Sequence, residues 1–481
     1  ACNQRSLYDS IYKRNCLRLI RECKLMSGIM MQILGSGAGG ADSGWVLEVV
    51  PSSTDAGTSI LKAVMEKSDG SFIAVGSANS QALTLKFTAD GTVSSLHKVT
   101  QVGGSYAVNA TTVVEDSNND VWIGGYWYSN QDVPGEAGWF ARTDDGDPQA
   151  SIQAYQNTNS RGGDMSIAYD PDENRVHTAF DGWTGSRRSV YLQKFNLAGT
   201  RQWAYQVAFN TSNSVRYAHW ETNTNRSGHT GNLLVSMITT INAGVGHYAH
   251  DTLVVDTNGD PQATYRSTSS TTNTGSGEGQ CIASDASFIY DIGYSEDVSL
   301  GNGHNAMHIR KINKATGALS WERFYLNKIG STYYQSGGRG IAVDSSGNVY
   351  ATSRHSGGDQ HDVLWKFNAS GTLQWAIRLG RTGSYTCRLD AITVGSDGFI
   401  YTGGYTQSSS TNNAIMFKIP PNGVSAGTYG NYTVSTPSYG QATGFLTFSD
   451  NGGSVSSAST QTVSPTNTDG TVSSTNTKTD L

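Results

Sequence analysis

The chain repeats one unit of about fifty-five residues. The repeat is clearest over residues 338–380, which read GRGIAVDSSGNVYATSRHSGGDQHDVLWKFNASGTLQWAIRLG. This unit contains four short apolar runs separated by Gly, Ser, Asn and Asp, a pattern that predicts an antiparallel meander of four strands. One such sheet cannot bury both of its own faces, so successive copies must pack against one another. The repeat therefore restricts the fold to an array of stacked small sheets.

A glycine shortly after the third predicted strand marks each copy, at intervals of about 52 to 60 residues. The seven marker glycines are Gly91, Gly146, Gly199, Gly259, Gly317, Gly371 and Gly423. A fourth strand follows each of the first six, and one more strand of that type, GWVLEVV at residues 44–50, precedes the first copy. The sequence therefore predicts an all-β fold, a seven-bladed β-propeller of four-stranded blades, whose last blade is closed by the N-terminal strand at residues 45–50. An eight-bladed ring, or closure by residues 431–436, are the alternatives.

The repeats also resemble a known family. Units such as GIAVDSSGNVYATS and ITVGSDGFIYTGGYTQSSSTNNAIMFKI are similar to the bacterial tandem β-propeller repeat. That repeat is common in secreted proteins and in tail- or fibre-type virion proteins of marine cyanophages. The resemblance is sharpest over residues 336–423, extends over residues 58–335 and does not reach the two ends. It implies a fold and a display role, and it supplies no catalytic residues.

The two ends differ from the repeats, so we predict three regions: an N-terminal docking arm at 1–43, a β-propeller at 44–428 and a C-terminal extension at 429–481. In the arm, apolar residues spaced by three or four over residues 6–26 predict a short helix, followed by an apolar anchor at 30–34 and a glycine hinge at 35–40. From residue 451 the Ser/Thr-rich extension has too few apolar residues to fold alone. We expect a partner subunit to order it, through a strand added to another chain's edge.

Composition excludes several classes of partner. The formal net charge of −6 offers no basic surface for nucleic acid. No apolar run approaches the roughly 20 residues that span a bilayer, so we predict no membrane insertion. The five cysteines lack C-x-x-C spacing, which predicts free thiols in a reducing cytoplasm.

Two groups of residues are candidate metal ligands. Six histidines fall in the predicted loops between second and third strands of three consecutive blades: His247, His250, His304, His308, His355 and His361. They indicate either a transition-metal or pH-sensitive site, or unrelated polar loop residues. Acidic turns at 116–120, 170–174 and 344–348 resemble the start of a calcium loop but lack its central Gly and closing Glu, so side-chain-capped turns explain them. We predict no metal and no other cofactor.

No catalytic set is legible, and single acidic residues such as Glu66 and Glu322 do not make a catalytic pair. We therefore predict a non-enzymatic structural component of a bacteriophage virion, in the tail, tail fibre or capsid decoration. It would be assembled in the host cytoplasm and then be extracellular, with other virion proteins or copies of itself as partners.

The alternative is a glycan-binding adhesin that recognises a host surface. Flat aromatic rings offer apolar faces to sugars. The candidate glycan-binding residues are Tyr126, Trp127, Tyr128 and Trp183. A propeller hydrolase or lyase is the third possibility.

Overall fold

The computed structural model describes most of the repeat region and parts of both ends. It covers residues 29–34, 44–49, 58–99, 106–129, 137–144, 147–148, 153–155, 165–183, 188–209, 215–222, 233–242, 247–258, 261–269, 278–297, 304–329, 331–355, 360–382, 386–408, 411–442, 446–450 and 458–462. Within these ranges the chain has no helix that is long and apolar enough to cross a membrane. The helix predicted over residues 6–26 lies outside the described residues.

The described strands form seven antiparallel sheets, numbered here in chain order. Sheet 1 contains β3 (Ser59–Glu66), β4 (Phe72–Ala78), β5 (Gln81–Phe87) and β6 (Val93–Val99). Sheet 2 contains β7 (Tyr106–Glu115), β8 (Val121–Ser129), β9 (Ala137–Asp144), β10 (Asp147–Pro148) and β11 (Gln153–Tyr155). Sheet 3 begins with β12 (Ser166–Asp170), β13 (Arg175–Trp183), β14 (Arg188–Asn196) and β15 (Arg201–Phe209). Sheet 4 begins with β16 (Val215–Thr222), β17 (Leu233–Asn242), β18 (His247–Val255) and β19 (Pro261–Ser269).

The remaining three sheets follow the same order of strands. Sheet 5 begins with β20 (Glu278–Ser284), β21 (Phe288–Asp297), β22 (His304–Asn313), β23 (Leu319–Ile329) and β24 (Thr332–Tyr334). Sheet 6 begins with β25 (Ser336–Val343), β26 (Val349–His355), β27 (Val363–Phe367) and β28 (Leu373–Arg381). Sheet 7 contains β29 (Thr386–Val394), β30 (Ile400–Ser408) and β31 (Thr411–Ile419), and then β2 (Gly44–Val49) and β1 (Ile29–Leu34) from the N-terminal side of the chain.

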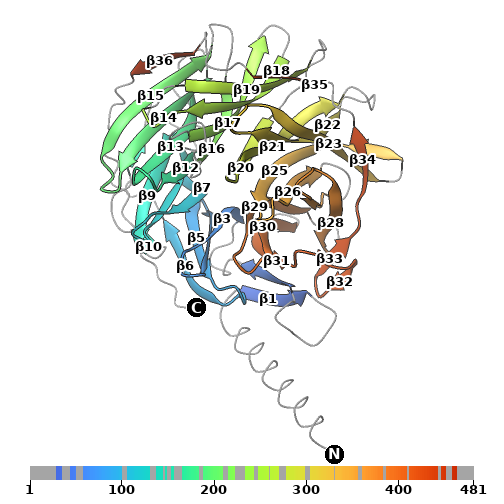
Figure 1. The fold of residues 1–481 in the computed structure, drawn as a ribbon. Coiled ribbons are helices and arrows are strands. Elements are labelled where there is room, and N and C mark those ends of the chain that lie inside the picture. The colour runs from blue at the N-terminus through green and yellow to red at the C-terminus, as the bar shows by residue number, and fades with distance from the viewer. Residues whose placement is uncertain are drawn as a thin grey trace, which may run out of the picture.

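The first strands of the sheets contact one another in a cycle. The order is β3, β7, β12, β16, β20, β25, β29 and back to β3, and Figure 1 shows these strands around a common centre. Later strands of each sheet lie progressively further out. The chain is therefore an all-β protein with a β-propeller fold, as predicted, and its cores lie between neighbouring sheets. Between sheets 7 and 1, for example, the ring of Phe72 stacks on Tyr401 with centroids 3.9 Å apart.

Neighbouring sheets are joined by a repeated polar contact. At the end of the third strand a Lys lies directly opposite a Trp of the fourth strand, and both donate hydrogen bonds to one backbone carbonyl in the next sheet. We call this arrangement the Lys–Trp clasp. It occurs as Lys194 and Trp203 on Thr257, Lys311 and Trp321 on Ala369, Lys366 and Trp375 on Pro421, and Lys418 and Trp45 on Ala89. The donor–acceptor distances are between 2.8 and 3.2 Å.

The last of these clasps involves the N-terminal strand. Trp45 of β2 lies opposite Lys418 of β31, which is the register that Trp375 and Lys366 adopt in sheet 6. The Trp45 indole is buried and packs edge-on against Phe87 of sheet 1. A strand from the start of the chain therefore occupies the fourth-strand position of sheet 7, and β1 pairs on its outer side. The alternative strand, β33 (Tyr432–Ser435), pairs instead with β28 in sheet 6.

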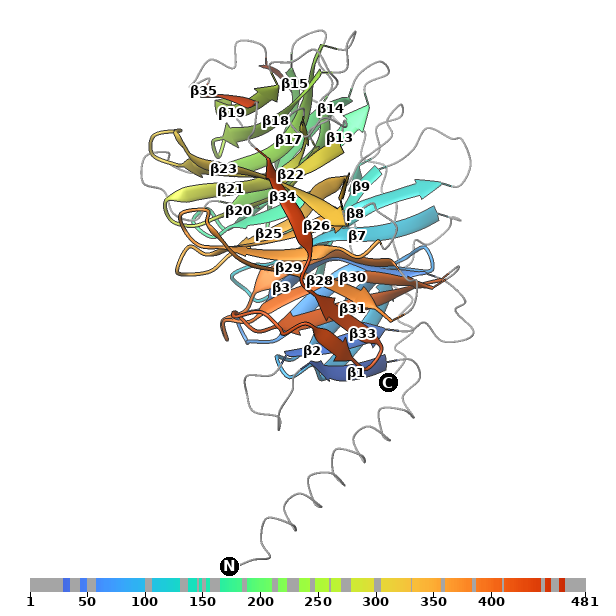
Figure 2. The ribbon, with the colours of Figure 1, turned by 90° about the vertical axis from the view of Figure 1, so that its right-hand side faces the viewer.

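The C-terminal segment adds outer strands to four consecutive sheets in reverse order. After β32 (Gly427–Tyr429), strand β33 pairs with sheet 6, β34 (Ser438–Ala442) with sheet 5, β35 (Leu446–Asp450) with sheet 4 and β36 (Ala458–Thr462) with sheet 3. Figure 2 shows β33 and β34 running along the outer side of the sheets. Each added strand covers a sheet edge that would otherwise present unpaired backbone groups. Strands at residues 429–436 and 444–448 were expected on the edge of the ring itself, and β33 and β35 pair there. Only the segment from residue 451 was expected on another chain, whereas its described strand, β36, pairs with β15 of the same chain. Likewise, residues 30–34, the predicted anchor, belong to β1 and pair with β2.

The acidic turns between first and second strands anchor an aromatic side chain. Asp116 accepts a hydrogen bond from the Trp122 indole at 2.8 Å, and Asp285 accepts one from the Tyr290 hydroxyl at 2.6 Å. Sheets 6 and 7 repeat this with Asp344 and Tyr350, and with Asp397 and Tyr401. The prediction of side-chain-capped turns is confirmed where these aspartates also accept backbone N–H groups.

Sheet 3 has a histidine where those sheets have an aromatic anchor. His177 lies opposite Ala168, the position that Tyr350 occupies opposite Ala342. His177 is fully buried. Burial, together with the positive charges of Lys194 and Arg175, lowers the pKa of His177 to about 3.

We expect the substitution Trp45→Ala to lower the free energy of unfolding by about 3 to 5 kcal/mol, because it empties a buried site and removes one clasp. Urea denaturation measures this loss, and Trp375→Ala in sheet 6 is the matched control. A Trp45→Ala protein as stable as the wild type would show that β2 does not hold the ring.

We expect His177→Tyr to remove a loss of stability at acid pH. The folded pKa of His177 is depressed, so between about pH 6.5 and about pH 3 the unfolded chain takes up a proton that the folded chain does not. Its contribution to stability is thus complete above about pH 6.5 and declines as the pH falls. Urea unfolding at several pH values should show that the free energy of unfolding of the variant rises relative to that of the wild type as the pH falls. A difference that does not change with pH would contradict this account.

Candidate functional site

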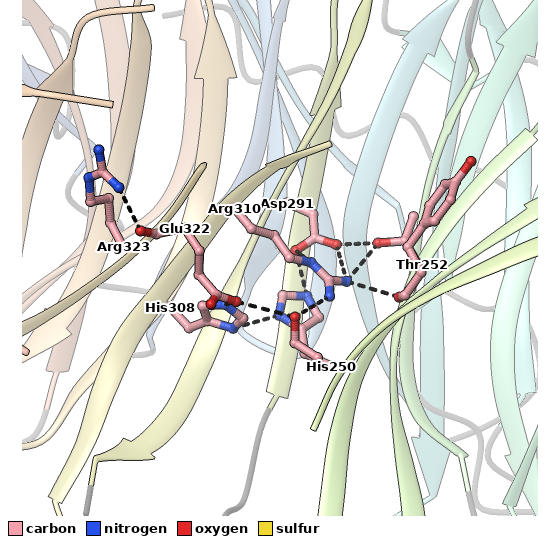
Figure 3. Close-up of polar contacts among 9 residues, drawn as sticks. His250, Thr252, Asp291, His308, Arg310, Glu322 and Arg323 are labelled. Atoms are coloured by element: carbon pink, nitrogen blue, oxygen red, sulfur yellow. Dashed lines mark hydrogen bonds and ion pairs between the residues drawn. The ribbon is translucent and has the colours of Figure 1, made fainter. Parts of the chain in front are cut away.

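A buried polar network fills one end of the space between sheets 4 and 5, while the other end is apolar. The polar side chains are His250, Thr252, Ser267, Asp291, His308, Arg310 and Glu322 (Figure 3). Strand register explains their convergence: Asp291 lies opposite Arg310, and Arg310 opposite Glu322. Residues directly opposite on neighbouring strands share one face of the sheet, so these side chains all point at sheet 4.

Arg310 and Asp291 form the fixed centre of this network. Both side chains are fully buried, with Arg310 Nη2 2.8 Å from Asp291 Oδ2. Arg310 also donates to the Ser267 hydroxyl at 2.8 Å, and the Thr252 hydroxyl donates to Asp291. A buried pair of charges needs such additional hydrogen bonds to offset its desolvation. Burial acts to raise the pKa of Asp291, but Arg310 and His250 outweigh it and hold that pKa well below its ordinary value.

Asp291 determines the tautomer of His250. The Nε2 atom of His250 is 2.7 Å from Asp291 Oδ1, and an anionic carboxylate can only accept, so Nε2 carries a hydrogen. Burial lowers the pKa of His250 to about 4, although Asp291 acts in the opposite direction. The ring is therefore neutral at neutral pH, and its Nδ1 atom presents a lone pair.

That lone pair in turn determines how His308 is protonated. The two Nδ1 atoms are 3.1 Å apart, so Nδ1 of His308 must be the donor. Its Nε2 atom is 2.6 Å from Glu322 Oε1, which also accepts from the Ser267 hydroxyl at 3.2 Å. Burial acts to raise the pKa of Glu322, but His308, Arg310 and Ser267 together outweigh burial and lower that pKa. Glu322 is then a carboxylate, and His308 is an imidazolium that shares one transferable proton with it.

Only the Glu322 end of this chain of hydrogen bonds reaches solvent. The side chain of Glu322 is 13% exposed, compared with 0% for His308 and 1% for His250. Proton exchange with a ligand would therefore pass through Glu322. The two histidines and Asp291 lie behind Glu322 and determine its protonation state.

The described residues of this network do not form a good metal site. The facing Nδ1 atoms could both bind one ion, but no third ligand lies beside them in the described ranges. The described chain offers one other group of donors, Asp170, Glu173 and His177, whose ligand atoms lie within 4.8 Å of one another. Lys194 already forms an ion pair with Glu173 there. The charge and geometry of that group fit a turn anchor better than an ion.

The structure brings together two of the six predicted histidines. His250 and His308 lie in strands rather than in loops. His355, in sheet 6, is buried; its backbone N–H donates to Asp362 Oδ1 at 3.0 Å, and its ring lies edge-on to Tyr334. His361 lies beside Cys387 through a backbone bridge. The side chains of His247 and His304 lie outside the described residues.

Of the predicted glycan-binding residues, Tyr126 is half-buried near the end of β8. The side chains of Trp127, Tyr128 and Trp183 lie outside the described residues. Glu322 was dismissed in the sequence as a lone carboxylate, and its partner His308 was considered only as part of a metal or pH-sensitive site. The register of the repeat carried the missing signal, because Lys311 lies opposite Trp321 and this places Arg310 opposite Glu322.

No protein-family model matches the chain, and no curated protein sequence matches it. Similar folds occur in solved structures. A polysaccharide lyase of the PL25 type, an ulvan lyase, is 13% identical with a TM-score of 0.48, over 76% of this chain and 96% of that chain. The polysaccharide lyase Uly1 is 8% identical with a TM-score of 0.47, over 78% and 92%. The sialidase of Trypanosoma rangeli is 10% identical with a TM-score of 0.37, over 69% and 56%.

These comparisons correct two predictions. The similar structures are enzymes, lyases and a sialidase, and not virion proteins. The predictions of a non-enzymatic virion component, and of a chain that is not an enzyme, are therefore wrong. Such a likeness assigns no role to any residue here, so chemistry must be argued from the side chains. Membership of the tandem-repeat family, the three region boundaries, the partners and the virion location stay predictions.

Proposed function

We propose that the chain is a carbohydrate-active enzyme that cleaves an acidic polysaccharide by β-elimination. The observation that carries the proposal is the 2.6 Å contact between His308 Nε2 and Glu322 Oε1, at the one edge of the network that solvent reaches. A positioned group that both accepts and donates a proton is what general acid–base catalysis requires. Glu322 would touch the substrate, whereas His308, His250 and Asp291 would position it.

The network suits elimination better than hydrolysis. Glycoside hydrolases use two carboxylates on either side of the scissile bond. In this network the second carboxylate, Asp291, is fully buried and paired with Arg310 and His250. That leaves one carboxylate for the substrate, and elimination from a uronate needs no second one.

The step conserves protons. Glu322 accepts the proton on C5 of the uronate, whose bonding electrons form a C4–C5 double bond. The C4–O bond breaks, and the departing oxygen takes a proton from the Glu322–His308 pair. The pair gains one proton and loses one, so it returns to its starting state. Fixed hydrogen-bond partners keep it ready for this exchange without rearrangement.

We further infer that the seven sheets are the blades of one seven-bladed ring and that β2 is its closing strand. The cyclic contacts from β29 back to β3 and the Trp45 clasp support this. A closed ring would hold sheets 4 and 5 at a fixed spacing, which the network needs.

We expect Glu322→Gln to lower the rate of cleavage by about 10²- to 10⁴-fold, because the amide cannot accept a proton. The assay is the ultraviolet absorbance of the unsaturated product during digestion of uronate polysaccharides. Ulvan is the first to test, since the PL25-type ulvan lyase was solved bound to -[GlcA(1-4)Rha3S]-. Alginate and polygalacturonate follow.

The matched control is Glu115→Gln, at a carboxylate of sheet 2 that bonds Ser68 in a surface turn. It should cleave as the wild type does. Thermal unfolding must show that the Glu322→Gln protein is folded. A folded Glu322→Gln protein with wild-type activity would overturn the proposal, as would a wild-type protein that cleaves none of these polysaccharides.

A further inference from the structure

The second strands end near the centre of the ring with a side chain in one repeated position. This side chain lies opposite a residue of the neighbouring first strand that is two positions before the residue inserted by the bulge. In sheets 2, 5 and 7 this position holds a tyrosine that follows a glycine: Tyr126 opposite Asn109, Tyr294 opposite Glu278, and Tyr405 opposite Arg388. In sheet 6 it holds Arg354, opposite Gly337. A cation therefore lies at a position that other sheets give to an aromatic ring.

Arg354 is exposed and lies among other positive charges. Its guanidinium forms no hydrogen bond or ion pair within the described part of the chain. Burial and the nearby Arg388 and Arg339 lower the pKa of Arg354. Opposite it, Gly337 leaves open space: a Cβ added there would meet only the ring of Tyr294, at 3.7 Å. The site thus combines a cation that forms no direct ion pair among the described residues with room beside it.

The bulges of the inner strands add further charges. Each bulge inserts one extra residue, and bulges commonly redirect side chains near functional sites. The inserted residues in sheets 1, 6 and 7 are Lys62, Arg339 and Asp390. Lys62 Nζ is 2.8 Å from Asp390 Oδ2, and the Lys62 side chain is 38% exposed. These residues lie on the strands that surround the centre of the ring.

The charges of this region do not balance. Among the side chains that the structure describes there, Lys62, Arg339, Arg354 and Arg388 are positive and Asp362 and Asp390 are negative. Asp362 is paired with Arg388, and Asp390 with Lys62. Among these described side chains the positive charges outnumber the negative ones by two (four minus two), in a chain whose net charge is −6. We propose that this mouth of the ring, formed by Arg354 with Lys62, Arg339, Tyr294 and Tyr405, binds the anionic groups of an acidic saccharide. Arg354 would hold a carboxylate or sulfate, and the tyrosines would pack on sugar rings.

This inference rests on the proposed function only for the claim that the bound saccharide is the substrate. Binding is measured by isothermal titration of the full chain with three oligosaccharides of equal length: one with uronate and no sulfate, one with sulfate and no uronate, and one neutral. We expect an anionic oligosaccharide to bind, the neutral one to bind at least about tenfold more weakly, and added salt to weaken binding. Binding of the uronate form alone identifies the carboxylate, and binding of the sulfated form alone identifies the sulfate.

The variants are Arg354→Gln, which removes the charge, and Arg354→Lys, which keeps it. We expect the first to weaken binding about tenfold or more and the second to weaken it less. Arg142→Gln, at an exposed arginine of sheet 2 that pairs with Asp120, is the control and should bind as the wild type does. Equal binding of the neutral form, an Arg354→Gln protein with unchanged affinity, or no binding at all would overturn the inference. A nucleic-acid oligomer of equal charge that binds as tightly would do so too.

The two proposals fail separately. If Glu322→Gln leaves cleavage intact while Arg354→Gln loses binding, the acid–base assignment is wrong and the anion site stands. If Arg354→Gln binds normally while Glu322→Gln loses cleavage, the reverse holds.

Discussion

If β2 closes the ring, as we propose, its pairing with β31 is the contact on which the rest of the structure depends. A ring of small sheets has a first and a last sheet, and they stay together only if something crosses the gap between them. Here Trp45 and Lys418 come from opposite ends of the repeat region and share one carbonyl of sheet 1, that of Ala89. The same clasp joins sheets 3 to 4, 5 to 6 and 6 to 7. The tail strands then cover outer edges that the clasps leave open.

Rigid spacing between sheets is what allows charged groups to be buried between them. Arg310 and Asp291 are both fully buried, and such a pair is costly unless every remaining donor and acceptor finds a partner. The network meets this condition with two hydroxyls from the facing sheet 4, those of Thr252 and Ser267. The network leaves the imidazole of His250 neutral and that of His308 charged. A proton is therefore held between His308 and Glu322, the residue that reaches solvent. Electrostatics of this kind are lost if the sheets separate slightly.

Much of the fold could be predicted from the sequence, because strand length, turn residues and the spacing of Lys, Gly and Trp repeat in every copy. The acidic turns could also be predicted, because Asp344 and the equivalent aspartates of other copies accept hydrogen bonds from their own turns. The site was not predictable in the same way. His250 and His308 are 58 positions apart, and they meet only because two different sheets face each other in one register. The pairing of β36 with its own chain was missed for a related reason. Strands rich in Ser and Thr pair through their backbone, and such pairing leaves little trace in the pattern of side chains.

The central claim is that His250 fixes the protonation of His308, and it is tested most directly by nitrogen-15 NMR of the imidazole rings in the whole protein. At neutral pH the account predicts that His250 is neutral, with its hydrogen on Nε2 and a lone pair on Nδ1. It predicts that His308 carries hydrogens on both nitrogens, with the Nε2 hydrogen shared with Glu322. A hydrogen on Nδ1 of His250, or a neutral His308 with no hydrogen shared with Glu322, would contradict it.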